Sequence, residues 1–285
     1  MDASCTGSPS PLDLYMNPAD PPASAADVAP TVLLIGGFLT SPPLYTSMRR
    51  RLLASGAAAV VVAPVWLPDW LLAAVVGLGP IASRSARALV RAAAISASSP
   101  RSRGAPILVV GHSAGGIVAR LLTAPESFDG RRFDMADRIG AIVTLGTPHD
   151  LAPSARVGRQ RALAATSFAA RVVPGPWFAP TTAYLAVSSR AVVGRRSGTP
   201  RERAAIELYA GLRPAAVALD RAEPTGDGLV PVASALLEGA DSLVLDAVVH
   251  GQFAGRPWYG SSEAIDVWWP RALHAWRSAL EARAG

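Results

Sequence analysis

The chain has 285 residues, half of them hydrophobic, so it can bury the core of one large α/β domain or of two small ones. Its formal net charge is +6, and its basic residues are all arginines, scattered in short clusters rather than gathered in one stripe interleaved with aromatic residues. This pattern argues against nucleic-acid binding. We expect the arginines to lie on solvent-exposed helix faces and loops, with transient contact with an anionic membrane surface as the alternative. The single cysteine, Cys5, excludes an intramolecular disulfide.

The first 29 residues are rich in proline, alanine and serine and contain no arginine. They lack the basic start and apolar core of a secretory signal, and their four aspartates are unlike a transit peptide. We therefore predict a flexible N-terminal tail over residues 1–29, one α/β domain over residues 30–285, and a cytoplasmic location.

Beyond the tail, short apolar runs alternate with longer helical segments. Strands are predicted at residues 31–35, 58–65, 107–110, 139–145, 215–219 and 242–248. Helices are predicted from Ser41-Pro42 onward and at residues 81–97, 114–122 and 262–283. Strands that are apolar on both faces and separated by helices indicate a mostly parallel sheet with helices on both faces.

Two stretches depart from this alternation. Residues 57–82 are nearly all apolar, but Asp69 and three prolines interrupt them, so we predict a buried strand and an apolar loop or helix over 66–79 instead of a membrane span. Residues 151–213 hold helical pieces and an apolar, proline-rich patch at 172–180. A long insertion between strands is usually functional or disordered, so we predict a helical cap there, with ordinary surface helices as the alternative.

The most informative stretch is Gly111-His112-Ser113-Ala114-Gly115, which joins the strand at 107–110 to the helix at 114–122. The spacing Gly-x-Ser-x-Gly in a strand–turn–helix context predicts a sharp turn with an exposed serine at its apex. The helix that follows would direct free backbone N–H groups and its positive dipole end toward a developing oxyanion.

A serine nucleophile needs a base, and the chain has only four histidines. His112 lies beside Ser113, and its side chain should point away from the nucleophile. His149 precedes any credible acid in the chain, and His274 is expected to pack within a tryptophan-rich helix. His250 follows the last predicted strand and starts a glycine-containing loop, so it is the predicted base.

The acid that orients the base should lie between the nucleophile and His250. Asp220, Glu223 and Asp227 all follow the strand predicted at 215–219. We favour Asp227, because the glycines on both sides of it allow a tight turn, and we keep Asp220 as the rival. Of the two oxyanion donors, Ala114 would supply one N–H group and the loop Gly36-Gly37-Phe38 the other.

Together these segments resemble the α/β-hydrolase superfamily, and within it the lipases and esterases, over roughly residues 30–255. The resemblance rests on the serine turn Gly111-His112-Ser113-Ala114-Gly115-Gly116, on Gly146-Thr147-Pro148-His149, and on Asp227-Gly228-Leu229-Val230 with His250. It implies a nucleophile, a general base, an orienting acid and two oxyanion donors, which are Ser113, His250, Asp227, Phe38 and Ala114.

The sequence departs from this family in two places. The usual His-Gly before the oxyanion residue is Gly36-Gly37 here, so the hydrogen bonds of that loop must differ. Some of these lipases bind calcium through an aspartate just after the catalytic histidine, whereas His250 is followed by Gly251-Gln252. We therefore expect no metal site and no cofactor.

The predicted function is hydrolysis of a lipophilic acyl ester, of small-molecule or lipid type, with no obligate protein partner. The lipophilic preference rests on aromatic residues that would line an acyl site or lid, namely Trp66, Trp70, Trp177 and Phe178; core packing is the alternative for them. An acyltransferase or thioesterase with the same triad, and a non-catalytic hydrolase-fold binding protein, stay open as alternatives.

Overall fold

The structure, a computed structural model, describes residues 27–151, 157–212 and 223–285. Its centre is a six-stranded sheet in the order β2-β1-β3-β4-β5-β8, and every neighbouring pair of strands is parallel. The strands are β1 (Thr31–Ile35), β2 (Ala59–Val62), β3 (Ile107–His112), β4 (Ile139–Leu145), β5 (Ala183–Ser189) and β8 (Asp241–Leu245). The predicted parallel sheet is thereby confirmed.

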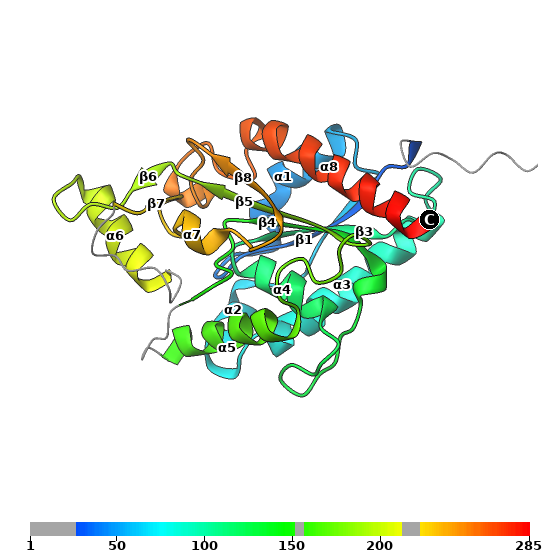
Figure 1. Cartoon of the computed structure of the whole chain (residues 1–285), viewed down its shortest axis with the longest axis horizontal. Coiled ribbons are helices and arrows are strands. Elements are labelled where there is room, and N and C mark those ends of the chain that lie inside the picture. The colour runs from blue at the N-terminus through cyan, green and yellow to red at the C-terminus, as the bar shows by residue number, and fades with distance from the viewer. Residues whose placement is uncertain (1–26, 152–156, 213–222) are drawn as a thin grey trace, which may run out of the picture.

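Helices cover both faces of this sheet (Figure 1). One face carries α1 (Thr46–Ala54) and α8 (Ser262–Ala284), and the other carries α2 (Leu67–Val76), α3 (Gly79–Ser98), α4 (Ala114–Thr123) and α5 (Val157–Val172). Successive strand residues point to opposite faces, so Leu33 and Ile35 join the core under α3 and α4, while Val32 and Leu34 join the core under α1 and α8. Burial on both faces explains why β1 is apolar throughout.

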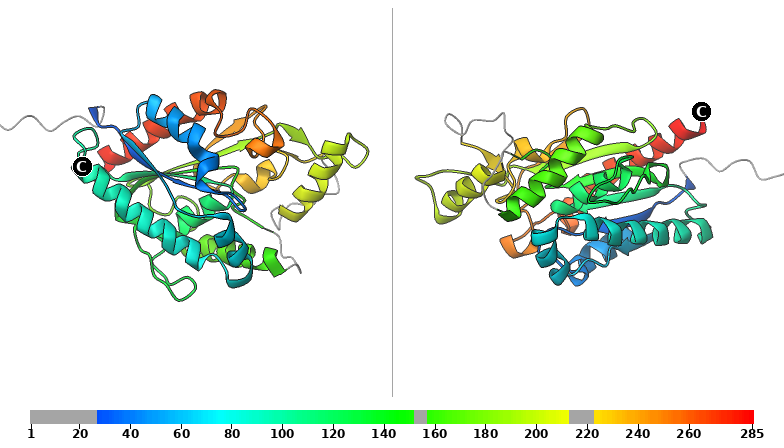
Figure 2. Two further views of the ribbon diagram at one scale, coloured as in Figure 1. Left: turned by 180° about the vertical axis from the view of Figure 1, so that it is seen from behind. Right: turned by 90° about the horizontal axis from the view of Figure 1, so that it is seen from below.

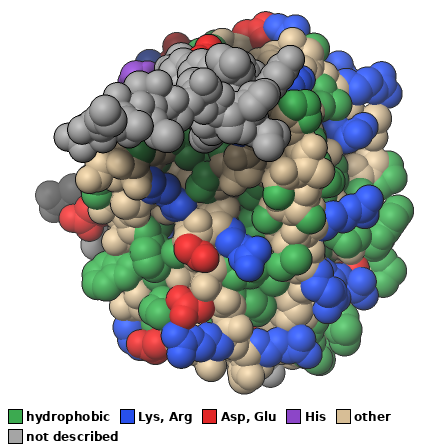
Figure 3. All heavy atoms as spheres, turned by 90° about the vertical axis from the view of Figure 1, so that its right-hand side faces the viewer, with side chains coloured by type: hydrophobic (Ala, Val, Ile, Leu, Met, Phe, Trp, Pro, Cys, Tyr) green, Lys and Arg blue, Asp and Glu red, His purple; other side chains and the backbone are tan. Residues whose placement is uncertain are grey.

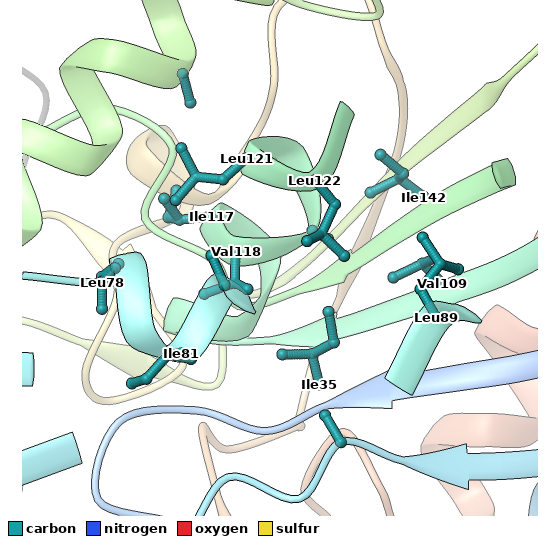
Figure 4. Close-up of a cluster of buried hydrophobic side chains, with 14 of the residues drawn as sticks. Ile35, Leu78, Ile81, Leu89, Val109, Ile117, Val118, Leu121, Leu122 and Ile142 are labelled. Atoms are coloured by element: carbon teal, nitrogen blue, oxygen red, sulfur yellow. The ribbon is translucent and has the colours of Figure 1, made fainter. Parts of the chain in front are cut away.

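The core under α3 and α4 is made of aliphatic side chains that converge from the helices and the sheet. Figure 4 shows Ile117, Val118, Leu121 and Leu122 of α4 directed toward residues of α3 and of the central strands. This packing anchors the first turn of α4 directly after β3, and so fixes the position of the turn between them.

The stretch 151–213 is not the single cap insertion that the sequence predicted. Within it, β5 pairs with β4 and β8 as an internal strand of the sheet, and α5 packs against α2 and α4. The sequence Ala-Tyr-Leu-Ala-Val-Ser-Ser of β5 ends in two serines, so it did not read as an apolar strand. The predicted strand at 215–219 and the alternative acid Asp220 lie outside the described residues.

The chain leaves the sheet after β5 and builds a small peripheral unit before it returns. This unit holds the antiparallel pair β6 (Val192–Val193) and β7 (Thr225–Gly226), and α6 (Pro200–Leu212). Figure 2 shows α6 at the end of the molecule opposite the C-terminus. The short helix α7 (Val232–Ala235) then leads back to β8.

The surface arginines and the described helices show no feature typical of a protein that spans a membrane. Among described residues on the face shown in Figure 3, arginines lie scattered among apolar and acidic side chains, without a continuous basic stripe. Several arginines pair with carboxylates at the surface, including those in Arg171–Glu126, Arg190–Asp246 and Arg271–Asp241. None of the described helices combines the length and the hydrophobicity needed to cross a membrane.

Candidate active site

Ser113 lies at the apex of the turn between β3 and α4, in a backbone conformation that is unusual for a side-chain-bearing residue. Its φ is 53° and its ψ is −128°, a combination that costs about 1–3 kcal/mol and persists only where the surroundings impose it. They do so by close packing: a Cβ atom on Gly111 would lie 2.5 Å from Cα of Gly116, and one on Gly115 would collide with the carbonyl oxygen of Ile35. Glycine is therefore required on both sides of the serine.

The end of β4 and the residues that follow it hold this turn from the neighbouring strand. The backbone N–H of Ser113 donates to the carbonyl oxygen of Leu145 at 2.8 Å. The Thr147 hydroxyl donates to the carbonyl oxygen of Ser113 at 2.9 Å. These two bonds fix the backbone on either side of the serine side chain, so the end of β4 positions the turn.

Asp227 and His250 come together as a buried pair. Nδ1 of His250 lies 2.8 Å from Oδ2 of Asp227, and the Tyr259 hydroxyl donates to the same oxygen at 3.0 Å. Oδ1 accepts the backbone N–H groups of Leu229 at 2.9 Å and Val230 at 2.8 Å. The carboxylate therefore accepts four hydrogen bonds, which fix its orientation.

This environment keeps Asp227 ionised. Burial alone would raise the pKa of its carboxyl, but the His250 imidazole and the Leu229 and Val230 amides together lower that pKa below its usual range. Because an ionised carboxylate can only accept hydrogen bonds, Nδ1 of His250 is the donor in the contact. In a neutral imidazole the other nitrogen, Nε2, is then a free acceptor, as a general base requires.

The loop that begins at His250 lies directly against the turn that holds Ser113. Nε2 of His112, the residue before Ser113, lies 2.7 Å from the carbonyl oxygen of His250, and the two imidazole centroids are 5.0 Å apart. Among the described residues, the hydrogen bonds join Asp227 to His250 but do not extend to the Ser113 hydroxyl. The structure thus brings the three predicted triad residues to one edge of the sheet and directly links two of them.

The two predicted oxyanion donors flank the serine. The Phe38 and Ala114 backbone N–H groups donate no hydrogen bond within the described part of the chain, so both stay available to a ligand. The oxyanion loop also approaches Ser113 closely, since a Cβ atom on Gly37 would lie 2.8 Å from Cβ of Ser113. Only glycine allows this approach of the loop to the nucleophile.

The structure shows how the loop Gly36-Gly37 is held without the histidine that the resemblance leads one to expect. The ring of Tyr45 lies where a Gly36 side chain would point, 2.7 Å from an added Cβ atom. Its hydroxyl accepts the Gly37 N–H at 2.8 Å. The loop is therefore held by a tyrosine from the 3-10 helix η3 (Pro42–Tyr45), just before α1.

The two remaining histidines lie elsewhere. His149 is buried between Arg120, 3.3 Å from its Nδ1, and the Thr144 hydroxyl, 3.0 Å from its Nε2. Burial and the Arg120 charge lower its pKa well below the usual range, so it stays neutral and structural. His274 is exposed on α8 instead of packed, because the tryptophans of that helix, such as Trp268, occupy its inner face.

Two of the four aromatic residues predicted to bind substrate follow β2, at the same edge of the sheet as Ser113. Trp66 is half-exposed just before α2, whereas Trp70 is fully buried in α2. The Trp70 ring packs edge-on against Phe38 of the oxyanion loop, with ring centroids 5.9 Å apart. Trp70 therefore packs against the oxyanion loop and is not exposed at the surface.

The other two, Trp177 and Phe178, lie at the wrong edge of the sheet for that role. They come just before β5, and Phe178 lines a cavity with Asp137 and Arg283, next to the start of β4. Ser113 follows the end of β3, and the strands are parallel, so the two groups lie at opposite edges. Phe178 packs partly buried against the core near the amino ends of the strands, whereas Trp177 is 55% exposed.

Sequence reasoning missed three hydroxyl-bearing residues that hold the site together, namely Tyr45, Thr147 and Tyr259. Thr147 belongs to a segment whose resemblance was noted, but its contact with Ser113 spans two strands. Tyr45 and Tyr259 act over separations of 8 and 32 residues, on Gly37 and Asp227. Only the unusual Pro257-Trp258-Tyr259-Gly260 sequence could have drawn attention to one of them.

Within the described ranges, no group of three or more histidine, cysteine, aspartate or glutamate side chains is placed to hold a metal ion. The side chains around Ser113 that carry chemistry are instead an imidazole, a carboxylate and phenols, which suit proton transfer.

Comparisons with known proteins found one matching family and several solved structures that are similar to this chain. The family described as the PGAP1-like alpha/beta domain matches residues 89–163, which include the serine turn, β4 and Gly146–His149. The mature lipase BlEst2 of Bacillus licheniformis superposes with a TM-score of 0.57 at 15% identity, over 91% of this chain and 96% of that one. A Thermogutta terrifontis esterase, with propionate bound, gives a TM-score of 0.46 at 15% identity, over 90% and 84% of the two chains.

No curated protein matches the sequence. At 15% identity, the superposition on BlEst2 indicates a shared fold but does not transfer an activity to this chain. The parallel sheet, the covering helices and the superposition on BlEst2 together show that the chain has the α/β-hydrolase fold.

Proposed function

We propose that this α/β-hydrolase-fold protein is a serine hydrolase that cleaves carboxylic esters through an acyl-enzyme. The observation that carries the proposal is the buried Asp227–His250 pair, 2.8 Å apart, lying against a turn that holds Ser113 at a φ of 53°. The fold adds support, because a lipase shares it. A strained serine beside an oriented imidazole is the arrangement that nucleophilic acyl transfer needs.

In the proposed reaction, the Ser113 hydroxyl oxygen attacks the ester carbonyl carbon while Nε2 of His250 takes the hydroxyl proton. Asp227 stabilises the imidazolium that forms, and the Phe38 and Ala114 N–H groups stabilise the oxyanion. The alcohol then leaves with the proton from His250, which gives the acyl-serine. Water attacks this ester with His250 as base, and the carboxylic acid leaves as Ser113 is regenerated. The Ser113–His250 hydrogen bond would form on substrate binding, as is common in such sites.

The proposed substrate is lipophilic, because an apolar surface adjoins the oxyanion loop. We call it the α2 apolar face; its side chains are between 42% and 66% exposed, and they are Phe38, Leu39, Trp66, Leu67, Leu71, Leu72, Val75 and Val76. An exposed apolar patch of this kind marks a ligand, protein or membrane contact. We propose that it receives the acyl chain and lies against the lipid aggregate that presents the ester.

Covalent labelling tests the proposed nucleophile. A fluorophosphonate probe is expected to modify the wild-type protein at Ser113, and Ser113→Ala is expected to abolish the modification, because only an activated serine attacks the phosphorus atom. Mass spectrometry of the labelled peptide identifies the site. Folded wild-type protein that takes up no label would contradict the enzymatic proposal and favour a binding protein of the same fold.

A chain-length series tests the lipophilic preference. Leu71→Glu, on the α2 apolar face, is expected to lower kcat/KM for nitrophenyl laurate by about tenfold, since burial of such a side chain against an acyl chain contributes about 1.5 kcal/mol. Activity on nitrophenyl acetate, which does not reach α2, should change little. The matched control is Val267→Glu on α8, which is 53% exposed where Leu71 is 56% exposed. Equal losses on both esters, or in both variants, would argue against the assignment.

A further inference from the structure

A chain of buried hydrogen bonds runs beneath the candidate site from the oxyanion loop to the loop that begins at His250. The Gly37 N–H donates to the Tyr45 hydroxyl at 2.8 Å, and this hydroxyl lies 2.9 Å from Nδ1 of His112. Nε2 of His112 lies 2.7 Å from the carbonyl oxygen of His250. Tyr45 and His112 are both buried, so these groups have few alternative partners.

The donor and the acceptor in each of these hydrogen bonds can be assigned from the groups that can only accept. The His250 carbonyl oxygen can only accept, so Nε2 of His112 carries a proton. Burial, followed by the His250 charge, lowers the His112 pKa to about 3, so the ring is neutral and Nδ1 is an acceptor. Burial raises the Tyr45 pKa to about 12, so its hydroxyl keeps the proton that Nδ1 needs. The bonds therefore run in one direction, from Gly37 through Tyr45 and His112 to His250.

A second contact of Tyr45 does not change this order. Its hydroxyl also lies 3.2 Å from the Thr40 hydroxyl, which itself donates to the Gly37 carbonyl oxygen at 2.6 Å. If Tyr45 donated to Thr40 alone, Nδ1 of His112 would be left as a buried acceptor without a donor, which is unfavourable. The shorter bond to His112 is therefore the favoured one.

This chain connects the parts of the site that must be aligned. Gly37 precedes the Phe38 donor and packs against Ser113, and His112 is the residue immediately before Ser113 in the sequence. We propose that Tyr45 and His112 are positioning residues, which hold the oxyanion loop and the His250 loop in register with the nucleophile. The inference rests on the proposed serine hydrolase function for its effect on rate. Misplacement of a catalytic group by about 1 Å can cost about 100-fold in rate, so this alignment matters.

Three substitutions separate the links of the chain. Tyr45→Phe removes the hydroxyl and keeps the ring. His112→Asn offers an amide near the Nδ1 position, which retains a partner for Tyr45 but does not reach His250. His112→Gln reaches toward the Nε2 position and can donate to His250, but it removes the acceptor that faces Tyr45. Each variant is expected to lower kcat by about 10-fold to 100-fold, with KM within about threefold. Burst amplitude counts the active sites, so that partial unfolding is not scored as slow turnover.

Coupling distinguishes a connected chain from local packing. In the double variant Tyr45→Phe/His112→Gln, the losses in kcat should be clearly less than multiplicative, because both changes interrupt the same chain. Amide hydrogen exchange gives a readout independent of activity. Tyr45→Phe should accelerate exchange in peptides covering residues 36–40 and also residues 250–254, which Tyr45 does not hydrogen bond.

The outcomes separate this inference from the proposed function. If wild-type protein lacks esterase activity and labelling but Tyr45→Phe accelerates exchange at residues 250–254, the chain holds and the proposed function fails. If the wild type is active and all three folded variants keep wild-type kcat, the inference is overturned. Multiplicative losses in kcat, or faster exchange confined to residues 36–40, would also overturn it, because each would show two independent local contacts.

Discussion

His250→Ala is expected to reduce kcat by about 10⁵-fold, because loss of the base in a serine hydrolase removes the only route by which the nucleophile is deprotonated at neutral pH. In this protein the contacts of one histidine identify it as the base. His250 is the histidine whose Nδ1 is held by a buried carboxylate, at 2.8 Å, and whose loop lies against the residue before Ser113. The measurement is kcat on a nitrophenyl ester, with KM expected to change little.

His149→Ala is the matched control, because it removes a second buried histidine from the same edge of the sheet. Its imidazole contacts Arg120 and Thr144, and neither residue belongs to the proposed reaction. We expect kcat within about tenfold of wild type and a free energy of unfolding lowered by about 1–3 kcal/mol, since Arg120 loses a partner in the core. If His149→Ala abolished turnover and His250→Ala preserved it, the assignment of the base would be wrong.

The sequence predicted those parts of the site that depend on few alternatives. With four histidines, only His250 had both a preceding acid and a loop position, and the structure places it beside Asp227. The glycines around Ser113 could be interpreted because their spacing implies close approach, and the contacts of Gly111 and Gly115 show that approach. The parallel sheet was predictable because buried strands such as β1 are apolar on both faces.

Other features depend on information that a local pattern does not carry. The strand β5 ends in two serines whose burial is decided by neighbouring strands, so its local sequence does not indicate a buried strand. An apolar patch does not indicate which edge of the sheet it covers, so the sequence alone does not show that Trp177 and Phe178 lie at the edge opposite Ser113. The bonds made by Tyr45 and Tyr259 join loops from different parts of the chain, and hydroxyl groups have no periodic signature.

Asp227→Asn is expected to lower kcat by about 10⁴-fold while it leaves the shape of the site unchanged. Oδ1 of Asp227 accepts two backbone N–H groups, from Leu229 and Val230. The oxygen of an asparagine would take that position, so its NH₂ group would face Nδ1 of His250 and the Tyr259 hydroxyl. An NH₂ group donates and cannot accept, so His250 would have to present an unprotonated Nδ1 and carry its proton on Nε2.

An imidazole in that tautomer cannot take the proton of Ser113, and this is why the loss should be in kcat. Asp220→Asn tests the other acid that the sequence left open, and it should keep more than about half of the wild-type kcat if Asp227 is the residue that orients His250. Asp241→Asn removes an exposed carboxylate paired with Arg271, and it should also keep more than about half of the wild-type kcat, because a surface ion pair contributes little. Measurement of kcat for the three variants, with near-ultraviolet circular dichroism to verify folding, decides between them. A large loss in Asp220→Asn with an active Asp227→Asn would transfer the acid to residue 220, and the buried Asp227–His250 pair would then be a structural bond only.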